Sequence, residues 1–140
     1  MIIETLKKNN IFSSLKNDEL QKIAKFFEKL NFKNNDYIFT EGDLSEWFYI
    51  TAQGKIKIIK HTIMGKDIIL EIMSAGDMFG GIAVLDNKPY PASAQAMEIA
   101  AVIRISRKNL LRILDEYQIL KLEIVKLNEF APVEIFVEVE

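Results

Sequence analysis

The chain has 140 residues, of which 49% are hydrophobic and 27% are charged, a balance typical of one globular domain. Its 18 basic and 20 acidic residues give a formal net charge of −2, so no global positive field indicates nucleic-acid binding. The absence of cysteine excludes thiolate iron–sulfur clusters, structural Cys–zinc sites, thiol nucleophiles and disulfides. No apolar run approaches the roughly 18 residues that span a bilayer, and no signal-peptide core is visible, so we expect a cytoplasmic protein.

The first part of the chain is predicted to be helical. Residues 1–16 form a Lys- and Asn-rich lead-in that we expect to dock through its apolar residues. A helix is predicted from Asp18 to Leu30, with Asn17 as its N-cap. Its apolar residues share one face at helical spacing: Leu20, Ile23, Ala24, Phe27 and Leu30.

From Tyr37 onward the hydrophobic period changes to that of strands. Gly-containing turns separate the apolar runs, and we expect Gly42 and Gly76 to adopt a positive φ at two corners. Strands are predicted over residues 37–40, 47–52, 55–60, 67–73, 93–98 and 100–105. Many short strands between flanking helices predict a mainly β, α+β fold of the jelly-roll-like β-roll type.

Residues 78–96 form the most informative stretch for function. Gly80-Gly81 precedes a short apolar helical turn, and small residues follow. Free N–H groups at a helix start can bind an anion that small residues allow to approach. We therefore expect a ligand-binding site that comprises Phe79, Gly80, Gly81, Ile82, Ala83, Tyr90, Ala92, Ser93 and Ala94. The alternative is that the glycines serve only a turn and the alanines only tight packing.

This stretch resembles the phosphate-binding cassette of the cyclic-nucleotide-binding domain. That domain occurs in bacterial regulators of the catabolite-activator and fumarate-nitrate-regulator type, in kinase regulatory subunits and in gated channels. Two upstream segments also resemble the family: the Gly-Asp turn at Gly42-Asp43, and the Tyr-Ile hairpin around Gly54. The resemblance covers roughly residues 11 to 115 and implies a β-roll that serves as a non-enzymatic regulatory or sensor domain.

Two positions depart from the family's pattern. Members that bind cyclic nucleotides carry a Glu directly after Phe-Gly for the ribose hydroxyl, and an Arg after the following Pro for the phosphate. This chain has Gly81 and Tyr90 there, and a phenol cannot replace a bidentate, charge-assisted Arg–phosphate pair. The segment Pro89-Tyr90-Pro91 resembles instead the branch of regulators whose effectors are not cAMP.

Two functional hypotheses follow from these departures. The first is a sensor domain that binds cAMP only weakly and takes a different small-molecule effector, or that transmits a signal. The second is an interaction or structural domain whose pocket is filled by its own side chains. Tyr90 either stacks on a ligand at the pocket mouth or fills the vacated phosphate site. An open cavity beside Gly80-Gly81 favours the sensor, and a buried Tyr90 favours the interaction domain.

The C-terminal part is predicted to pair with another chain. Ser106 is the expected N-cap of a helix over 107–115. Five residues then follow at the spacing of a short coiled-coil seam, which predicts a homodimer or a partner protein: Ile113, Tyr117, Leu120, Ile124 and Leu127. The alternative is that this seam packs on its own β-roll.

We expect three parts in this chain: the lead-in over 1–16, the β-roll with flanking helices over 17–115, and a C-terminal helix and tail over 116–140. Residues 133–140 alternate like a strand and carry no basic recognition helix. No DNA-reading helix-turn-helix is expected, so these residues alone should not bind nucleic acid.

The sequence shows no residue pattern for metal binding, cofactor binding or catalysis. His61 is the only histidine, and Glu71, Asp77 and Asp86 show no metal-ligand spacing, so we expect no metal and no cofactor, haem included. No Ser-His-Asp set or phosphate-binding P-loop is apparent. We therefore expect no catalytic residues and no enzymatic activity.

Overall fold

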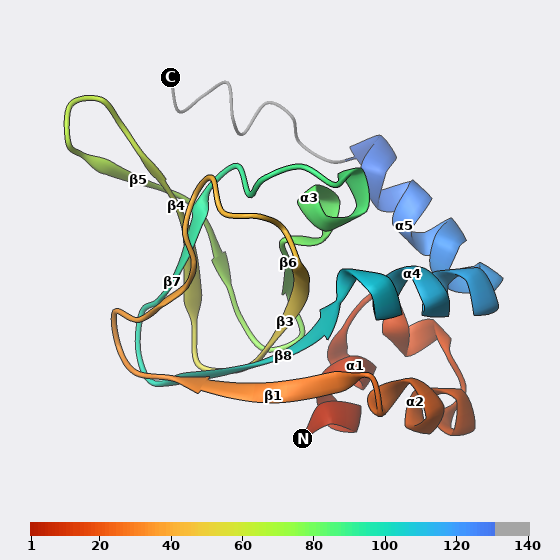
Figure 1. Cartoon of the computed structure of the whole chain (residues 1–140). Helices are drawn as coiled ribbons and strands as arrows, with labels where there is room; N and C mark the ends of the chain where they lie inside the picture. Colours follow the sequence, from red (N-terminus) through yellow and green to blue (C-terminus); the bar gives the residue numbers. More distant parts are fainter. Residues whose placement is uncertain (131–140) are drawn as a thin grey trace.

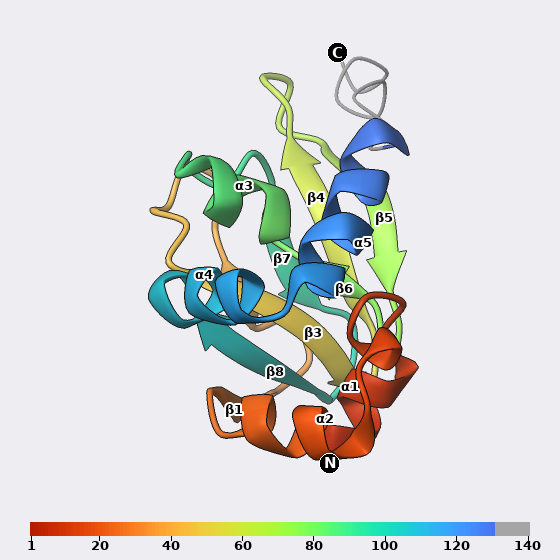
Figure 2. The same cartoon turned by 90° about the vertical axis from the view of Figure 1, so that its right-hand side faces the viewer.

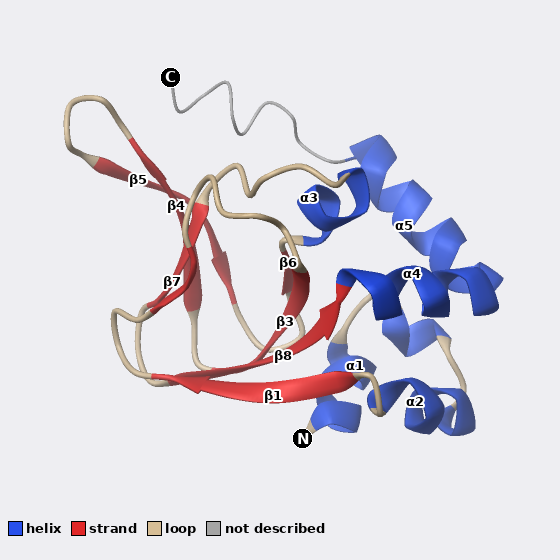
Figure 3. Ribbon diagram, in the orientation of Figure 1, coloured by secondary structure: helices blue, strands red, loops and turns tan. Residues whose placement is uncertain are grey.

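A computed structural model describes the backbone of residues 1–130 and the side chains of residues 1–124. Within them, eight strands form two four-stranded antiparallel sheets that face each other as a β-roll, with most helices gathered on one side (Figures 1 and 3). The predicted mainly β fold with flanking helices is confirmed. The call of a strand over residues 133–140 lies outside the described residues.

The two sheets divide the strands between them. The first sheet has the order β1-β8-β3-β6 and the second the order β2-β7-β4-β5. The strands are β1 (Phe27–Phe32), β2 (Tyr37–Phe39), β3 (Trp47–Gln53), β4 (Ile56–His61), β5 (Asp67–Met73), β6 (Met78–Phe79), β7 (Ser93–Ala96) and β8 (Ala100–Ser106). Gly42 and Gly76, at the two predicted corners, have φ values of 90° and 93°, which confirms the positive φ expected of them.

The helices lie mainly against the first sheet, and α5 starts beside the end of α4 and leads away from it (Figure 2). They are α1 (Ile2–Lys8), α2 (Asn17–Ala24), α3 (Gly81–Asp86), α4 (Arg107–Glu116) and α5 (Gln118–Phe130), with one 3₁₀ turn over Phe12–Ser14. Among residues 1–130, none of these helices combines the length and hydropathy needed to cross a membrane.

The helix predicted from Asp18 to Leu30 is wrong in its second half. The helix α2 ends at Ala24, and residues 27–32 form β1. Every residue of β1 has an antiparallel partner on β8, from Phe27 opposite Ile105 onward. The apolar spacing of this segment fits a helix locally, but pairing with a strand more than 60 residues away decides its conformation.

The lead-in packs tightly on the roll through a buried asparagine. The Asn9 side chain donates a hydrogen bond to the Gly76 carbonyl (3.0 Å) and accepts from the N–H groups of Ile11 and Phe12. A Cβ added at Gly76 would lie 2.8 Å from the carbonyl oxygen of Lys8, so α1 approaches this corner as closely as glycine allows. The division of the chain into three parts stays a prediction.

Two helix starts differ in how well they were predicted. The Ser106 Oγ accepts a hydrogen bond from the Asn109 N–H (3.2 Å), which confirms Ser106 as the N-cap of α4. The helix α2 starts one residue earlier than expected, so Lys16 and not Asn17 is its cap. The Lys16 N–H donates to the Glu19 carboxylate at 2.9 Å.

The predicted coiled-coil seam does not form one continuous helix. Tyr117 separates α4 from α5, and the side chains of Ile113 and Leu120 are fully buried within this single chain. Ile124 packs against the same core, and the side chain of Leu127 lies outside those described. These seam positions therefore pack on their own domain, as the alternative held, and dimerisation stays a prediction.

A pair of leucines on α5 tests this packing. Leu120→Ala should lower the free energy of unfolding by about 2–5 kcal/mol, because it leaves a cavity in the core. The control Leu122→Ala, whose side chain is 61% exposed, should change it by about 0.5 kcal/mol at most. Urea denaturation followed by circular dichroism measures both values. Equally small losses would contradict the burial of Leu120 in its own chain.

Candidate functional site

The cassette begins where β6 turns into α3. Gly80 has a φ of 80° and forms the N-cap of α3, a helix of only six residues that begins at Gly81. A Cβ added at Gly81 would lie 3.0 Å from two ring carbons of Phe48. The Phe48 ring therefore occupies the space that a side chain at position 81 would need.

Tyr90 lies inside the protein and not at a pocket mouth. Its side chain is 3% exposed, and its ring stacks on that of Phe39 at a centroid distance of 3.8 Å and an angle of 10°. The hydroxyl donates to the Trp47 carbonyl (2.5 Å) and accepts from the Trp47 N–H (3.2 Å). The phenol is thus packed on its face and hydrogen-bonded at its tip.

The Tyr90 ring also fills the space beside the start of α3. A Cβ added at Gly80 would lie 3.1 Å from the Tyr90 Cε1. Phe39, Tyr49 and Phe79 continue the aromatic cluster, with centroid distances of 5.3 to 6.0 Å between their rings. Burial in this cluster raises the pKa of the Tyr90 hydroxyl well above the ordinary tyrosine value.

The backbone of Tyr90 is held as firmly as its side chain. Its N–H donates to the carbonyl of Asp43 (3.0 Å), and its carbonyl accepts from the N–H of Gly42 (2.9 Å). These two bonds tie the end of the cassette to the loop between β2 and β3. The Gly-Asp turn and the cassette, separated by about a third of the chain, therefore form one structural unit.

The remaining predicted site residues divide between the core and the surface. Phe79 and Ala83 are buried on the core side, as are Ala92 and Ala94, whereas Ile82 is exposed. Ser93 is fully buried, but its hydroxyl accepts from the Glu41 N–H (2.8 Å) and lies 3.4 Å from the His61 Nε2. The structure therefore aims Ser93 at β4 and the β2–β3 loop. A ligand-binding role for these nine residues stays a prediction.

A Ser-His-Asp connection that the sequence analysis missed lies on β4, β5 and β7. The His61 Nδ1 is 2.5 Å from an Asp67 carboxylate oxygen, and its Nε2 faces the Ser93 Oγ. The register pair of His61 with Asp67 is a local hairpin signal, but the approach of Ser93 depends on the pairing of β4 with β7. Because the Ser93 hydroxyl has no solvent-exposed surface, a substrate carbonyl cannot reach it.

Glu41, whose N–H donates to Ser93, also forms an ion pair with Lys60 of β4. The Lys60 ammonium lies 2.9 Å from a Glu41 carboxylate oxygen and also donates to the Pro91 carbonyl (3.0 Å). Together with Ser93, these contacts fasten the residues after Tyr90 to β4. We read the set as structural. Among the described residues, no group of three or more His, Cys, Asp or Glu side chains could hold a metal ion.

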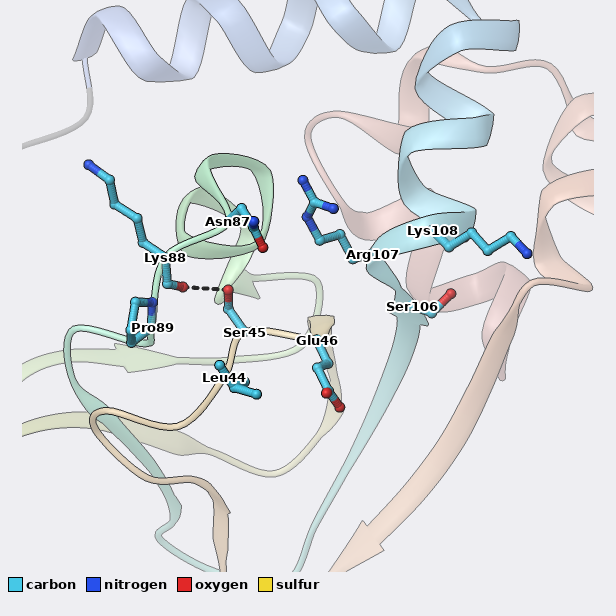
Figure 4. Close-up of a pocket in the computed structure, with 9 residues that line it drawn as sticks. All are labelled: Leu44, Ser45, Glu46, Asn87, Lys88, Pro89, Ser106, Arg107 and Lys108. Atoms are coloured by element: carbon cyan, nitrogen blue, oxygen red, sulfur yellow. Dashed lines mark hydrogen bonds between the residues drawn. The ribbon is translucent and has the colours of Figure 1, made fainter.

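A surface pocket of about 310 Å³ lies outside the cassette (Figure 4). Three chain segments meet there, and its lining consists of Leu44, Ser45, Glu46, Asn87, Lys88, Pro89, Ser106, Arg107 and Lys108. Ser45 donates to the Lys88 carbonyl, and the Arg107 Nε donates to the Val84 carbonyl (2.9 Å). The side chains of Lys88 and Lys108 point to opposite sides, away from its centre (Figure 4). Sequence patterns miss this pocket because turn and cap residues form it.

A second pocket, of about 320 Å³, lies beside α1 at the opposite end of β3. It is lined by Met1, Glu4, Thr5, Lys8, Ala52 and Gln53. Neither of these two pockets is lined by Gly80, Gly81, Ala92 or Ser93. Of the predicted ligand site, the structure thus brings Gly80 and Tyr90 close together, and both of these pockets lie elsewhere.

Known proteins resemble the chain in sequence. The family model described as "Cyclic nucleotide-binding domain" matches residues 29–117. The cyclic AMP receptor protein of Thermus thermophilus is 26% identical over 109 residues, which cover 78% of this chain and 50% of the relative. A cAMP-dependent protein kinase regulatory subunit of Emericella nidulans is 33% identical over 104 residues, which cover 74% of this chain and 24% of the relative.

The fold resembles that of a solved sensor domain. The sensor domain of the transcriptional regulator DNR from Pseudomonas aeruginosa superimposes with a TM-score of 0.82 and 26% identity, covering 98% of this chain and 92% of that domain. The chain spans half or less of the two full-length relatives above. The matched residues, the two-sheet roll and the cassette between β6 and β7 agree on one assignment. The chain belongs to the cyclic-nucleotide-binding domain family, as a regulatory domain of the catabolite-activator and fumarate-nitrate-regulator type.

Proposed function

We propose that this chain is a non-enzymatic signalling domain whose cassette is closed by its own Tyr90, and that it acts through contacts with other proteins. The observation that supports this proposal is the buried, stacked and doubly hydrogen-bonded Tyr90 ring. It is the feature that the sequence analysis assigns to the interaction domain. In this proposal the chain keeps the regulatory role of the family but no longer depends on a cyclic nucleotide.

The cost of opening the cassette supports this view. Removing a buried aromatic side chain from a core typically costs about 3–5 kcal/mol, which gives the scale for moving the Tyr90 ring into water. A ligand that needs the space must supply that free energy from its own binding. About 3 kcal/mol corresponds to roughly two powers of ten in affinity.

The two missing anchors lower the affinity further. The Thermus thermophilus relative is named for cAMP, and the resemblance assigns the ribose to a Glu and the phosphate to an Arg. Position 81 of this chain is a glycine closed off by Phe48, and position 90 is a neutral phenol. Losing a charge-assisted contact in a buried site costs about 2–5 kcal/mol.

The proposed protein contacts involve the C-terminal helices. Ile119 and Leu122 expose apolar side chains on α5, next to the buried Leu120. Such residues suit a homodimer or a partner helix. A net charge of −2 gives residues 1–140 no general attraction to nucleic acid, so we assign them no nucleic-acid partner.

A small-molecule sensor is the second candidate, and the pocket in Figure 4 favours it. That pocket includes Pro89, the residue next to Tyr90, and combines the apolar Leu44 with the cationic Arg107. An effector bound in this pocket would contact Pro89, the residue that precedes Tyr90 in the cassette. Native mass spectrometry of freshly purified protein tests this candidate, which requires a co-purifying small molecule.

The main proposal is tested by calorimetric titration with cAMP and cGMP. The unmodified chain should bind each nucleotide with a Kd no better than roughly 0.1 mM, because both charged anchors are missing. The Thermus thermophilus cyclic AMP receptor protein serves as the positive control in the same buffer. Micromolar affinity of this chain would contradict the proposal.

A second test removes only the Tyr90 hydroxyl. Tyr90→Phe should lower the free energy of unfolding at neutral pH by about 1–2 kcal/mol, because the Trp47 N–H and carbonyl lose their partner. The control Tyr37→Phe, at an exposed edge strand, should change it by about 0.5 kcal/mol at most. Urea denaturation measures both variants.

The same variant has a defined pH dependence. Because the pKa of Tyr90 is raised in the folded state, its stabilisation is fully present below about pH 10, the ordinary tyrosine value, and is lost as the pH rises toward the folded value. Tyr90→Phe should therefore lose less stability than the unmodified chain between pH 9 and pH 11. Identical losses would mean that Tyr90 is not buried as a neutral phenol.

A further inference from the structure

The surface pocket of Figure 4 contains an arginine without a counter-ion. Arg107 is half-buried, and its Nε donates to the Val84 carbonyl at 2.9 Å. This bond fixes the plane of the guanidinium and leaves its two terminal amino groups as donors. Among residues 1–124, whose side chains are described, no carboxylate pairs with Arg107. The pocket therefore holds a positioned cation that the chain itself does not neutralise.

The other two arginines of the chain show what Arg107 lacks. The Arg104 Nε lies 2.6 Å from a Glu28 carboxylate oxygen. The guanidinium of Arg112 lies over the Phe26 ring at 5.4 Å from its centroid. Arg107 has only a neutral carbonyl as its partner. Since a partly buried charge costs free energy unless it is paired, a bound anion would be favoured beside Arg107.

The remaining walls suit a ligand that is only partly polar. The side chains of Asn87 and Arg107 extend toward one another, whereas that of Glu46 points away from Arg107 (Figure 4). Leu44, which is 75% exposed, and the exposed Pro89 provide apolar surface. The Asn87 amide can donate to the same anion as the guanidinium. The pocket thus combines two donor groups with an apolar wall.

The charge of the lining also favours an anion. Lys88, Arg107 and Lys108 stand against one carboxylate, that of Glu46, although the whole chain has a net charge of −2. The two lysines point away from the centre of the pocket (Figure 4), so they attract an anion to the mouth without occupying the interior. Arg107 is left as the cation that can contact the ligand.

We propose that this pocket binds a small organic anion, a carboxylate or a phosphate monoester with an apolar portion. The terminal amino groups of Arg107 bind two oxygens of the anion, and the Asn87 amide donates to it. The apolar portion lies against Leu44 and Pro89. A volume of about 310 Å³ is at the lower end of the range for small-molecule pockets. The inference rests on the sensor candidate above and is independent of the closed cassette.

Such a ligand would connect the cassette with the C-terminal helices. Arg107 is the first residue of α4, and its N–H donates to the Glu46 carbonyl at 2.9 Å. The next residue, Trp47, binds the Tyr90 hydroxyl. An anion shared by Arg107 and Asn87 would join the start of α4 to the turn after α3. We expect it to stabilise the present arrangement and to leave Tyr90 in place.

Nuclear magnetic resonance of the isotope-labelled full chain tests the site with three probes: benzoate, phenyl phosphate and inorganic phosphate, at constant ionic strength. We expect saturable amide shifts in residues 44–46, 87–89 and 106–108. Phenyl phosphate should bind at least several-fold more tightly than inorganic phosphate, because its ring adds apolar contact. Neutral benzyl alcohol should not bind. The tighter of benzoate and phenyl phosphate identifies the carboxylate or the phosphate class.

Two variants assign the binding to this pocket. Arg107→Gln should weaken binding of the tighter probe at least tenfold, because a charge-assisted bidentate contact is lost. The matched control Arg112→Gln makes the same charge change on the same helix outside the pocket and should leave the affinity within twofold. Leu44→Ser, at an exposed position that tolerates substitution, should weaken binding of phenyl phosphate several-fold and leave that of inorganic phosphate unchanged.

Three results would overturn the proposal. The first is the absence of saturable shifts in the pocket segments with all three probes up to about 20 mM, a concentration that would reveal even weak binding. The second is an equal affinity of Arg107→Gln and Arg112→Gln or, should Arg107→Gln not fold, an unchanged affinity of Leu44→Ser for phenyl phosphate. The third is binding that shifts residues 79–83 and not the pocket segments, and it alone would also contradict the closed cassette.

Discussion

The contact between Tyr90 and Trp47 fixes the conformation of the cassette. A buried phenol without a partner would cost about 1–3 kcal/mol, but here one residue supplies both its acceptor and its donor. The backbone of Tyr90 is bonded in turn to the turn at Gly42 and Asp43. The Tyr90 ring, the segment between α3 and β7 that carries it, and the facing loop are therefore held by one another, and Tyr90 is a packed part of the core.

This arrangement changes the chemistry of a shared fold. The interior beside α3 is aromatic and neutral, with Phe39 and Phe48 around the positions that the family uses for charged anchors. A cationic side chain, Arg107, lies instead in the surface pocket outside the cassette. The β-roll depends on strand pairing and on glycines at its corners. Neither feature requires a Glu at position 81 or an Arg at position 90, so the fold tolerates Gly81 and Tyr90.

Local signals predicted much of the fold. The bounds of β5, the Ser106 cap and the corners at Gly42 and Gly76 follow from periodicity and turn chemistry. The strand β1 and the partners of Tyr90 do not, because each depends on pairing between segments far apart in the chain. For the site, the resemblance indicated that Gly81 and Tyr90 depart from the family's pattern, whereas the packing of Tyr90 on Phe39 is seen only in the structure.

The stacking of Tyr90 on Phe39 offers the most direct test of the closed cassette. Nuclear Overhauser contacts between these two rings can be followed in protein with labelled aromatic residues while cAMP is added to millimolar concentration. We expect the contacts to persist unchanged at every concentration, because the ring is packed and hydrogen-bonded. Loss of the contacts together with saturable shifts in residues 79–94 would contradict the account, since it would mean that a nucleotide displaces the ring.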